Sequence, residues 1–285
     1  MEILKLIKAN IRHKKGAFKS IVALMAIIVL SFAGTISNND NIDRTLKEAH
    51  KWAGTADMTA FVPVLNMNEE ISDSIRSNSN VTDMKMTDCI YANDITFNGQ
   101  DAYHMVFLFP ESRKFYRVFN NSFTGYIDNP EPLKEGEIYI PYGLKGVNDG
   151  LEIGSEVCFK STTDKISENE NSDKHTFKVK GFIAEPHFGA AIISTKRFFI
   201  SDADFNKIYS VVGEHNKLIQ FEIFLKNDAD YIKVKKELDD SCGLAEAANL
   251  IISDKETTDY TTLYSDAGSG VVAAFVILLV VIAII

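Results

Sequence analysis

Apolar residues gather in two uncharged stretches near the ends of the chain. Residues 20–39 carry no charged side chain, and residues 21–30 are all apolar. Twenty residues of α-helix span about 30 Å, the thickness of a bilayer core. The second stretch, residues 267–285, ends in a continuous apolar run that is shorter than such a core. We predict one transmembrane helix at 20–39 and the start of a second at 267–285. We also expect the natural protein to continue beyond Ile285.

Each apolar stretch has an alternative interpretation. Small residues at Ser31 and Ala33 could mark the cleavage site of a signal peptide that ends near residue 33. The second stretch could be a tail anchor or a lipid-anchor signal, although the polar spacer that normally precedes such a signal is short here.

Charge is distributed unevenly around the first apolar stretch. The whole chain has a formal net charge of −9, but residues 1–19 are basic, and Asp40 and Asp43 follow the first stretch. The positive-inside rule therefore predicts a cytoplasmic N-terminus in the plasma membrane and an extracytoplasmic region at 40–266. Residues 1–19 also read as an amphipathic helix that can lie on the inner leaflet. An acidic extracytoplasmic region argues against nucleic acid as a partner.

The extracytoplasmic region shows a strand-helix-strand pattern at each end. Near its start we predict a strand at 56–65, a helix at 68–76 capped by Asn68, and a hairpin of 89–97 with 103–109. Near its end we predict a strand at 218–225, a helix capped by Asn227 and Asp228, and a strand at 245–252. Two such halves indicate a split, ferredoxin-like sandwich.

The middle of this region has more β character. We expect strands at 137–141, 156–160 and 176–183, and a polar loop at 161–175. The predicted fold class is therefore α+β: a split β-α-β half with a β-rich insert at about 120–200, flanked by two transmembrane helices.

Three short phrases carry a resemblance to a known family. They are Glu137-Ile-Tyr-Ile-Pro-Tyr-Gly-Leu144, Gly150-Leu-Glu-Ile-Gly-Ser-Glu-Val157 and Phe177-Lys-Val-Lys-Gly-Phe-Ile183. Together with the membrane topology, they resemble the FtsX-like/MacB-like ABC transporter permeases. Ser155 departs from the family, which commonly has Asp there. The resemblance implies a porter-like α/β half with an inserted β lobe.

The resemblance also implies a function. Such permeases pair with a cytoplasmic ABC ATPase, usually as dimers with a second permease copy or a related permease. They couple ATP hydrolysis to export, extraction or mechanotransmission across the lipid bilayer. The helices that lead out of the membrane would then act as coupling stalks, here represented by Ile42, Leu46, Ala49, Tyr260 and Leu263. We further expect Trp52 and Phe61 to pack the first stalk against the domain. The alternative hypothesis is a membrane-anchored binding or sensor domain with no transport role.

Motifs for chemistry are sparse in this sequence. It contains no phosphate-binding loop, no H-E-x-x-H and no G-x-S-x-G. The histidines are scattered, so we expect no metal site, no cofactor and no catalytic residue. Cys89, Cys158 and Cys242 are interpreted as small apolar residues. A loop at Glu185, Pro186, His187 and Phe188 is a candidate partner-binding segment, with an ordinary turn as the alternative.

Overall fold

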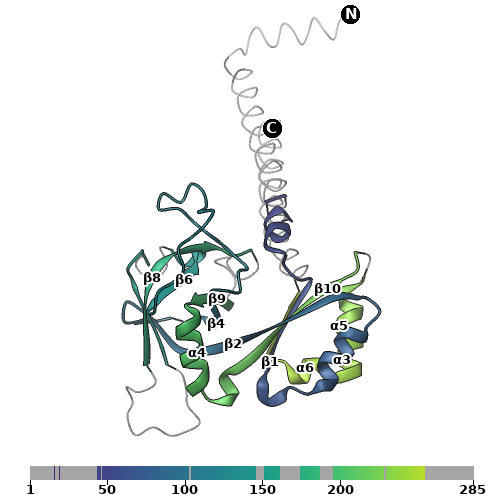
Figure 1. Cartoon of the computed structure of the whole chain (residues 1–285). Helices are drawn as coiled ribbons and strands as arrows, with labels where there is room; N and C mark the ends of the chain where they lie inside the picture. Colours follow the sequence, from purple (N-terminus) through teal and green to yellow (C-terminus); the bar gives the residue numbers. More distant parts are fainter. Residues whose placement is uncertain are drawn as a thin grey trace, which may run out of the picture. The chain divides into compact units, whose positions relative to one another are not determined.

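The computed structural model describes residues 44–253 except 46, 103, 146–150, 161–173, 187–194 and 228, together with residues 16 and 19. The chain divides into two compact units, and Ala49–Thr257 forms one of them (Figure 1). In the part of the chain described, no helix is long and apolar enough to cross a bilayer. The predicted membrane segments, and the stalk residues Ile42, Leu46, Tyr260 and Leu263, lie outside the described residues.

Four strands and two helices form the first half of the fold. The strands lie in the order β11-β1-β10-β2, and each neighbouring pair is antiparallel. This order is the split β-α-β arrangement that the two ends of the region predicted. Its elements are β1 (Met58–Pro63), α3 (Glu69–Ser77), β2 (Val81–Phe97), β10 (Lys217–Leu225), α5 (Tyr231–Cys242) and β11 (Leu250–Ser253).

The two helices cover one face of this half because their apolar residues recur at helical spacing. Ile71 and Ile75 of α3, and Val234 and Leu238 of α5, are buried in one core cluster. That cluster also contains Phe221 and other side chains from β1 and β10. Full burial of each such side chain contributes about 1.5–3 kcal/mol to folding.

A β-rich lobe is inserted between β2 and β10. Strand β2 belongs to both parts, because residues 81–90 pair with β10 and later residues pair with lobe strands. The sheet continues past β2 in the order β4-β9-β6-β8-β5, while β3 pairs with β2, and β7 pairs with β2 and β8. The lobe elements are β3 (Gln100–Asp101), β4 (Met105–Pro110), β5 (Arg117–Val118), β6 (Glu137–Pro141), β7 (Glu156–Lys160), β8 (Lys174–Ala184), β9 (Thr195–Ile200) and α4 (Asp202–Val211).

Short helices occupy several connections. They are the 3₁₀ helices η1 (Val64–Asn66), η2 (Tyr142–Leu144) and η3 (Glu214–Asn216) and the single-turn helix α6 (Leu244–Ala247). Helix α6 corrects one prediction, because residues 245–247 were expected to begin the strand at 245–252. Gly243 adopts a left-handed φ of 62° and ends α5, and the Asp239 carboxylate accepts from the Ala245 N–H, which starts the next turn.

Helix caps test the sequence signals directly. Asn68 accepts a hydrogen bond from the Ile71 N–H, as predicted. The cap predicted at Asn227 and Asp228 is wrong, because Asp230 caps α5 by accepting from the N–H groups of Ile232 and Lys233. Asn and Asp are both good N-cap residues, so the sequence does not decide between positions 227, 228 and 230. The cap is Asp230 because it directly precedes the first turn of α5.

The predicted α+β class is confirmed, and so are the predicted strands around residues 137–141, 156–160 and 176–183. All three cysteines are free thiols. Cys89 and Cys158 are buried in strands, and Cys242 ends α5. Burial, together with nearby Asp88, raises the pKa of the Cys89 thiol.

Candidate functional site

A pocket lies where the edge of the lobe sheet is interrupted. Strand β7 pairs with β8 as far as Lys178, and β5 pairs with β8 from Ile183 onward. Between them, loops take the place of a strand. The Gly154 N–H donates to the Val179 carbonyl, and the Phe119 N–H donates to the Phe182 carbonyl, at 2.8 and 2.9 Å. The cavity at this interruption has a volume of about 280 Å³.

A β-bulge places a lysine at the pocket. Ile138 is opposite Val179 but Tyr139 is opposite Gly181, so Lys180 is the extra residue of β8. Bulges redirect side chains and are common next to functional sites. The Lys180 ammonium lies 3.3 Å from the Glu137 carboxylate. Burial opposes ionisation of Glu137, but hydrogen bonds from the Lys134 N–H and from Lys180 outweigh it and lower the Glu137 pKa.

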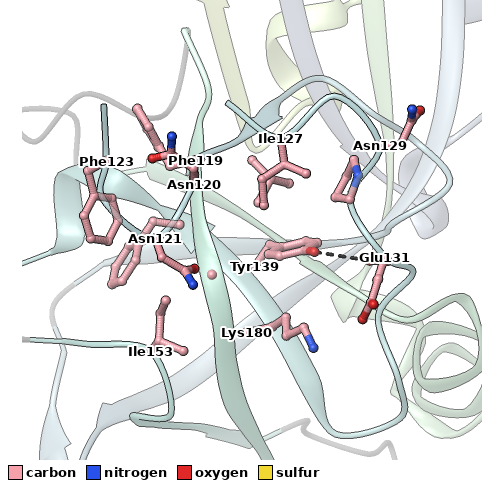
Figure 2. A pocket seen from close by; sticks show the side chains of 14 residues that line it. Phe119, Asn120, Asn121, Phe123, Ile127, Asn129, Glu131, Tyr139, Ile153 and Lys180 are labelled. Atoms are coloured by element: carbon pink, nitrogen blue, oxygen red, sulfur yellow. Dashed lines mark hydrogen bonds between the residues drawn. The ribbon is translucent and has the colours of Figure 1, made fainter. Parts of the chain in front are cut away.

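Gly181 keeps the floor of the pocket open. A Cβ atom at this position would lie 3.2 Å from the Tyr139 ring, closer than ordinary contact. The Tyr139 hydroxyl donates to the Glu131 carbonyl at 3.3 Å (Figure 2). Burial raises the Tyr139 pKa to about 12, helped by Glu111, Glu137 and Glu131, so the hydroxyl stays protonated and remains a donor.

The pocket walls combine apolar rings with amide groups. Phe123 has a left-handed φ of 56°, a strained conformation for a bulky residue that is more frequent at functional sites. It orients the ring toward Tyr142 and Phe182, at centroid distances of 5.3 and 5.8 Å. Val118 also lines the pocket. Further lining residues are Phe119, Asn120, Asn121, Ile127, Asn129, Glu131 and Ile153 (Figure 2).

Exposed apolar side chains surround this pocket. Tyr126, Ile127, Tyr142 and Ile153 are each more than 40% exposed. Ile127 and Ile153 line the pocket, and Tyr126 and Tyr142 contact its wall residue Phe119. Clustered exposed apolar residues mark binding surfaces more often than scattered ones.

A second pocket of about 200 Å³ is lined in part by residues 130–132. The two pockets share Pro130, Glu131 and Tyr139. The second adds Glu111, Lys114 and Asp202. Together their linings join an aromatic region to one that carries Glu111, Glu131 and Asp202.

The three phrases that carried the family resemblance meet at the first pocket. Tyr139 comes from the first phrase, Ile153 from the second, and Lys180, Gly181 and Phe182 from the third. Sequence reasoning missed this site because no phrase contains a recognisable ligand set. The available signals were Gly181 inside a strand pattern and the apolar residues of the turn-rich stretch 115–127.

The predicted partner loop begins at a buried ion pair. Glu185 accepts from the Arg197 Nη2 group, and both side chains are almost fully buried. Arg197 Nη1 also donates to Gln220 Oε1 at 3.2 Å, and the guanidinium lies 4.6 Å from the Phe115 ring centroid. This group joins β9 and the residue that follows β8 to β10. His187 and Phe188 lie outside the described residues, so partner binding by this loop stays a prediction.

The neighbouring Lys196 is also fully buried. Burial lowers the Lys196 pKa to about 8, although Glu185 opposes the shift. Of the predicted stalk residues, only Ala49 is described, in a helical segment that continues to residue 53. Among the described residues, no group of three or more His, Cys, Asp or Glu side chains could hold a metal ion.

Comparisons with known proteins gave distant likenesses. No family model and no curated protein matches the chain. A candidate lipoprotein from Bacillus anthracis is 10% identical with a TM-score of 0.34, and the match covers 68% of this chain and 95% of that one. The periplasmic region of MacB from Actinobacillus actinomycetemcomitans is 10% identical with a TM-score of 0.32, covering 72% and 92%. A domain of a candidate permease from Porphyromonas gingivalis is 8% identical with a TM-score of 0.30, covering 65% and 82%. At such scores these neighbours carry no functional argument.

Proposed function

We propose that this chain belongs to the permease subunit of an ABC transporter and contributes an extracytoplasmic region between two membrane helices. The observation that carries the proposal is the position of the two connections. The chain enters the sheet at Met58 and leaves it at Ser253, and these two residues are partners in the β1–β11 ladder. Both predicted stalks therefore connect to one pair of neighbouring strands, where a movement of either stalk acts on the same ladder.

The hydrophobic pattern and the order of elements support the same proposal. The uncharged stretches 20–39 and 267–285 flank the described region on both sides. A split β-α-β half with an inserted β lobe is the arrangement that the family resemblance implies. In this proposal the N-terminus is cytoplasmic, the chain dimerises with a second permease, and a partner ABC ATPase performs the hydrolysis. The chain itself would be neither an enzyme nor a nucleic-acid binder.

A second candidate is a membrane-anchored binding or sensor domain. The observation that favours it is the pocket with its exposed apolar rim, which could bind a ligand without any transport. The two proposals share the site and differ in whether an ATPase is bound at the membrane.

Affinity purification of the full-length gene product from its own membranes, in mild detergent, tests the choice. The permease proposal predicts an ATP-binding-cassette protein that co-purifies at a fixed stoichiometry. A product that is recovered alone, across several detergents that preserve known transporter complexes, would contradict it and favour the anchored domain.

A further inference from the structure

The helical segment 47–53 ends in a hydrogen-bonded C-terminal cap. The Gly54 N–H donates to the Lys51 carbonyl at 3.3 Å, and the Thr55 N–H donates to the His50 carbonyl at 3.1 Å. This pair of hydrogen bonds is the Schellman motif, and Gly54 has the left-handed φ of 59° that the motif needs. The motif therefore ends the helical turn that carries Trp52 a few residues before the start of β1.

Trp52 contacts the loop that forms the pocket wall. The Arg117 guanidinium lies 4.4 Å from the Trp52 ring centroid and 5.6 Å from the Tyr126 ring centroid. The two rings are themselves 6.4 Å apart. We call these three side chains the Trp52 stack. A guanidinium over an aromatic face contributes about 0.5–1 kcal/mol at an exposed site and more when water is excluded.

The Trp52 stack continues into the pocket. The Tyr126 ring lies 4.9 Å from the ring of Phe119, a residue of the pocket wall. Phe119 lies 4.9 Å from Tyr142, which in turn contacts Phe123 and Phe182. Arg117 is a residue of β5, adjacent to Val118 of the wall. Contacts therefore run from the pocket-wall residue Phe119 through Tyr126 and Arg117 to Trp52.

We propose that the Trp52 stack couples the pocket of the β lobe to the helical residues 49–53, so that each site biases the conformation of the other. The inference rests on the proposed function only in taking that segment as the end of a stalk. The stack itself is a property of this chain alone. Coupling between two sites is reciprocal, so helix movement would change the pocket as much as a ligand would change the helix.

The chain provides its own reporter, because Trp52 is its only tryptophan. The test uses the 285-residue chain in detergent micelles and measures Trp52 emission and amide hydrogen exchange. We expect Arg117→Ala to shift the emission to longer wavelength and to speed exchange at 49–53 and at 118–127 together, by roughly threefold or more. Arg117→Lys, which keeps the charge but loses the planar group, should give a smaller change at both segments.

A matched control removes a similar contact elsewhere. Lys85 lies 4.9 Å from the Phe224 ring centroid, in the β-α-β half. Lys85→Ala should leave Trp52 emission and both segments unchanged. Phe119→Leu tests the coupling from the pocket side. In the wild type, this substitution should speed amide hydrogen exchange at 49–53. In a chain that already carries Tyr126→Leu, it should have no such effect.

Two results would overturn the coupling. One is an effect of Arg117→Ala confined to 118–127, with unchanged Trp52 emission. The other is an equal effect of Phe119→Leu with and without Tyr126→Leu. Amide hydrogen exchange at β10 reports global unfolding, so a variant that fails to fold is recognised in the same data. If Arg117→Ala fails to fold, Tyr126→Leu replaces it in the test. Because no ATPase is needed, this outcome is independent of the purification that tests the proposed function.

Discussion

Buried charge is the main feature at the scale of single residues. Arg197, Glu185 and Gln220 form a hydrogen-bonded group between the lobe and the β-α-β half. Glu222 lies nearby on β10 and is only 4% exposed. Buried ion pairs add little net stability, but removing one partner leaves an uncompensated charge. This group therefore links the lobe to β10 of the β-α-β half through buried hydrogen bonds.

Glu185→Gln should lower the free energy of unfolding by about 3 kcal/mol, because it replaces the buried carboxylate that pairs with the Arg197 guanidinium by a neutral amide. Denaturant unfolding followed by circular dichroism measures this value. The control is Lys233→Gln, which breaks an exposed ion pair to Glu237 at 3.7 Å and should change stability by less than about 0.5 kcal/mol. Equal effects of the two variants would show that the Glu185 pair is not desolvated.

Glu222 should give the protein a distinctive pH dependence. Burial raises its pKa, as does Glu185, while Arg197, Lys85 and Arg113 lower it without cancelling the shift. A carboxyl whose pKa is higher in the folded state binds its proton more tightly when folded. Its contribution to stability is therefore present at low pH and declines as pH rises through the folded pKa.

We expect Glu222→Gln, which mimics the protonated acid, to stabilise the protein at neutral pH and to remove this decline. Unfolding measured from pH 4 to pH 8 in the wild type and the variant tests the sign. A variant that is less stable than the wild type at neutral pH would mean that the cations around Glu222 dominate over its burial.

At the scale of elements, local patterns predicted most strands and helices. The alternation of β10 and the helical spacing of α3 and α5 were visible in the sequence, because each buries one face against a single core. The pairing of β2 with β4 was predicted as a hairpin, because the two segments are close in sequence. The pairing of β2 with β7 could not be predicted, since long-range partners leave no local pattern. The pocket was missed for the same reason, because its residues come from β5, β6, β8 and the loops between them.

The start of α5 offers a prediction at this scale. Asp230→Ala should cost about 1 kcal/mol, because the carboxylate satisfies the N–H groups of Ile232 and Lys233. Thermal unfolding checks the value. Asn227→Ala, at the position that the sequence favoured for the cap, should have little effect on stability. If Asn227→Ala destabilised the protein more than Asp230→Ala, Asn227 would be the cap residue after all.

At the scale of the whole molecule, the proposed function depends on helices that transmit movement. A proline at Leu46, in the predicted first stalk, would break that helix, since proline inside a helix costs about 3 kcal/mol. We expect Leu46→Pro to leave membrane insertion and partner ATPase activity intact while transport or resistance is lost. Leu46→Ala is the control that keeps the helix. If transport survives Leu46→Pro, the stalk hypothesis is wrong.

The ladder pair of Met58 and Ser253 has a consequence for how such a protein can change over evolution. A module whose two ends are neighbours can be added to a membrane hairpin, or removed from it, without separating the two helices. The two ends of the lobe are also neighbours, because the lobe leaves the β-α-β half from β2 and returns to it at the adjacent β10. In the proposed permease, the described region would be an insertion into a membrane hairpin, as the lobe is an insertion into the β-α-β half. We expect the inserted lobe to vary most in length and surface among related chains, while the strands at the base keep their order.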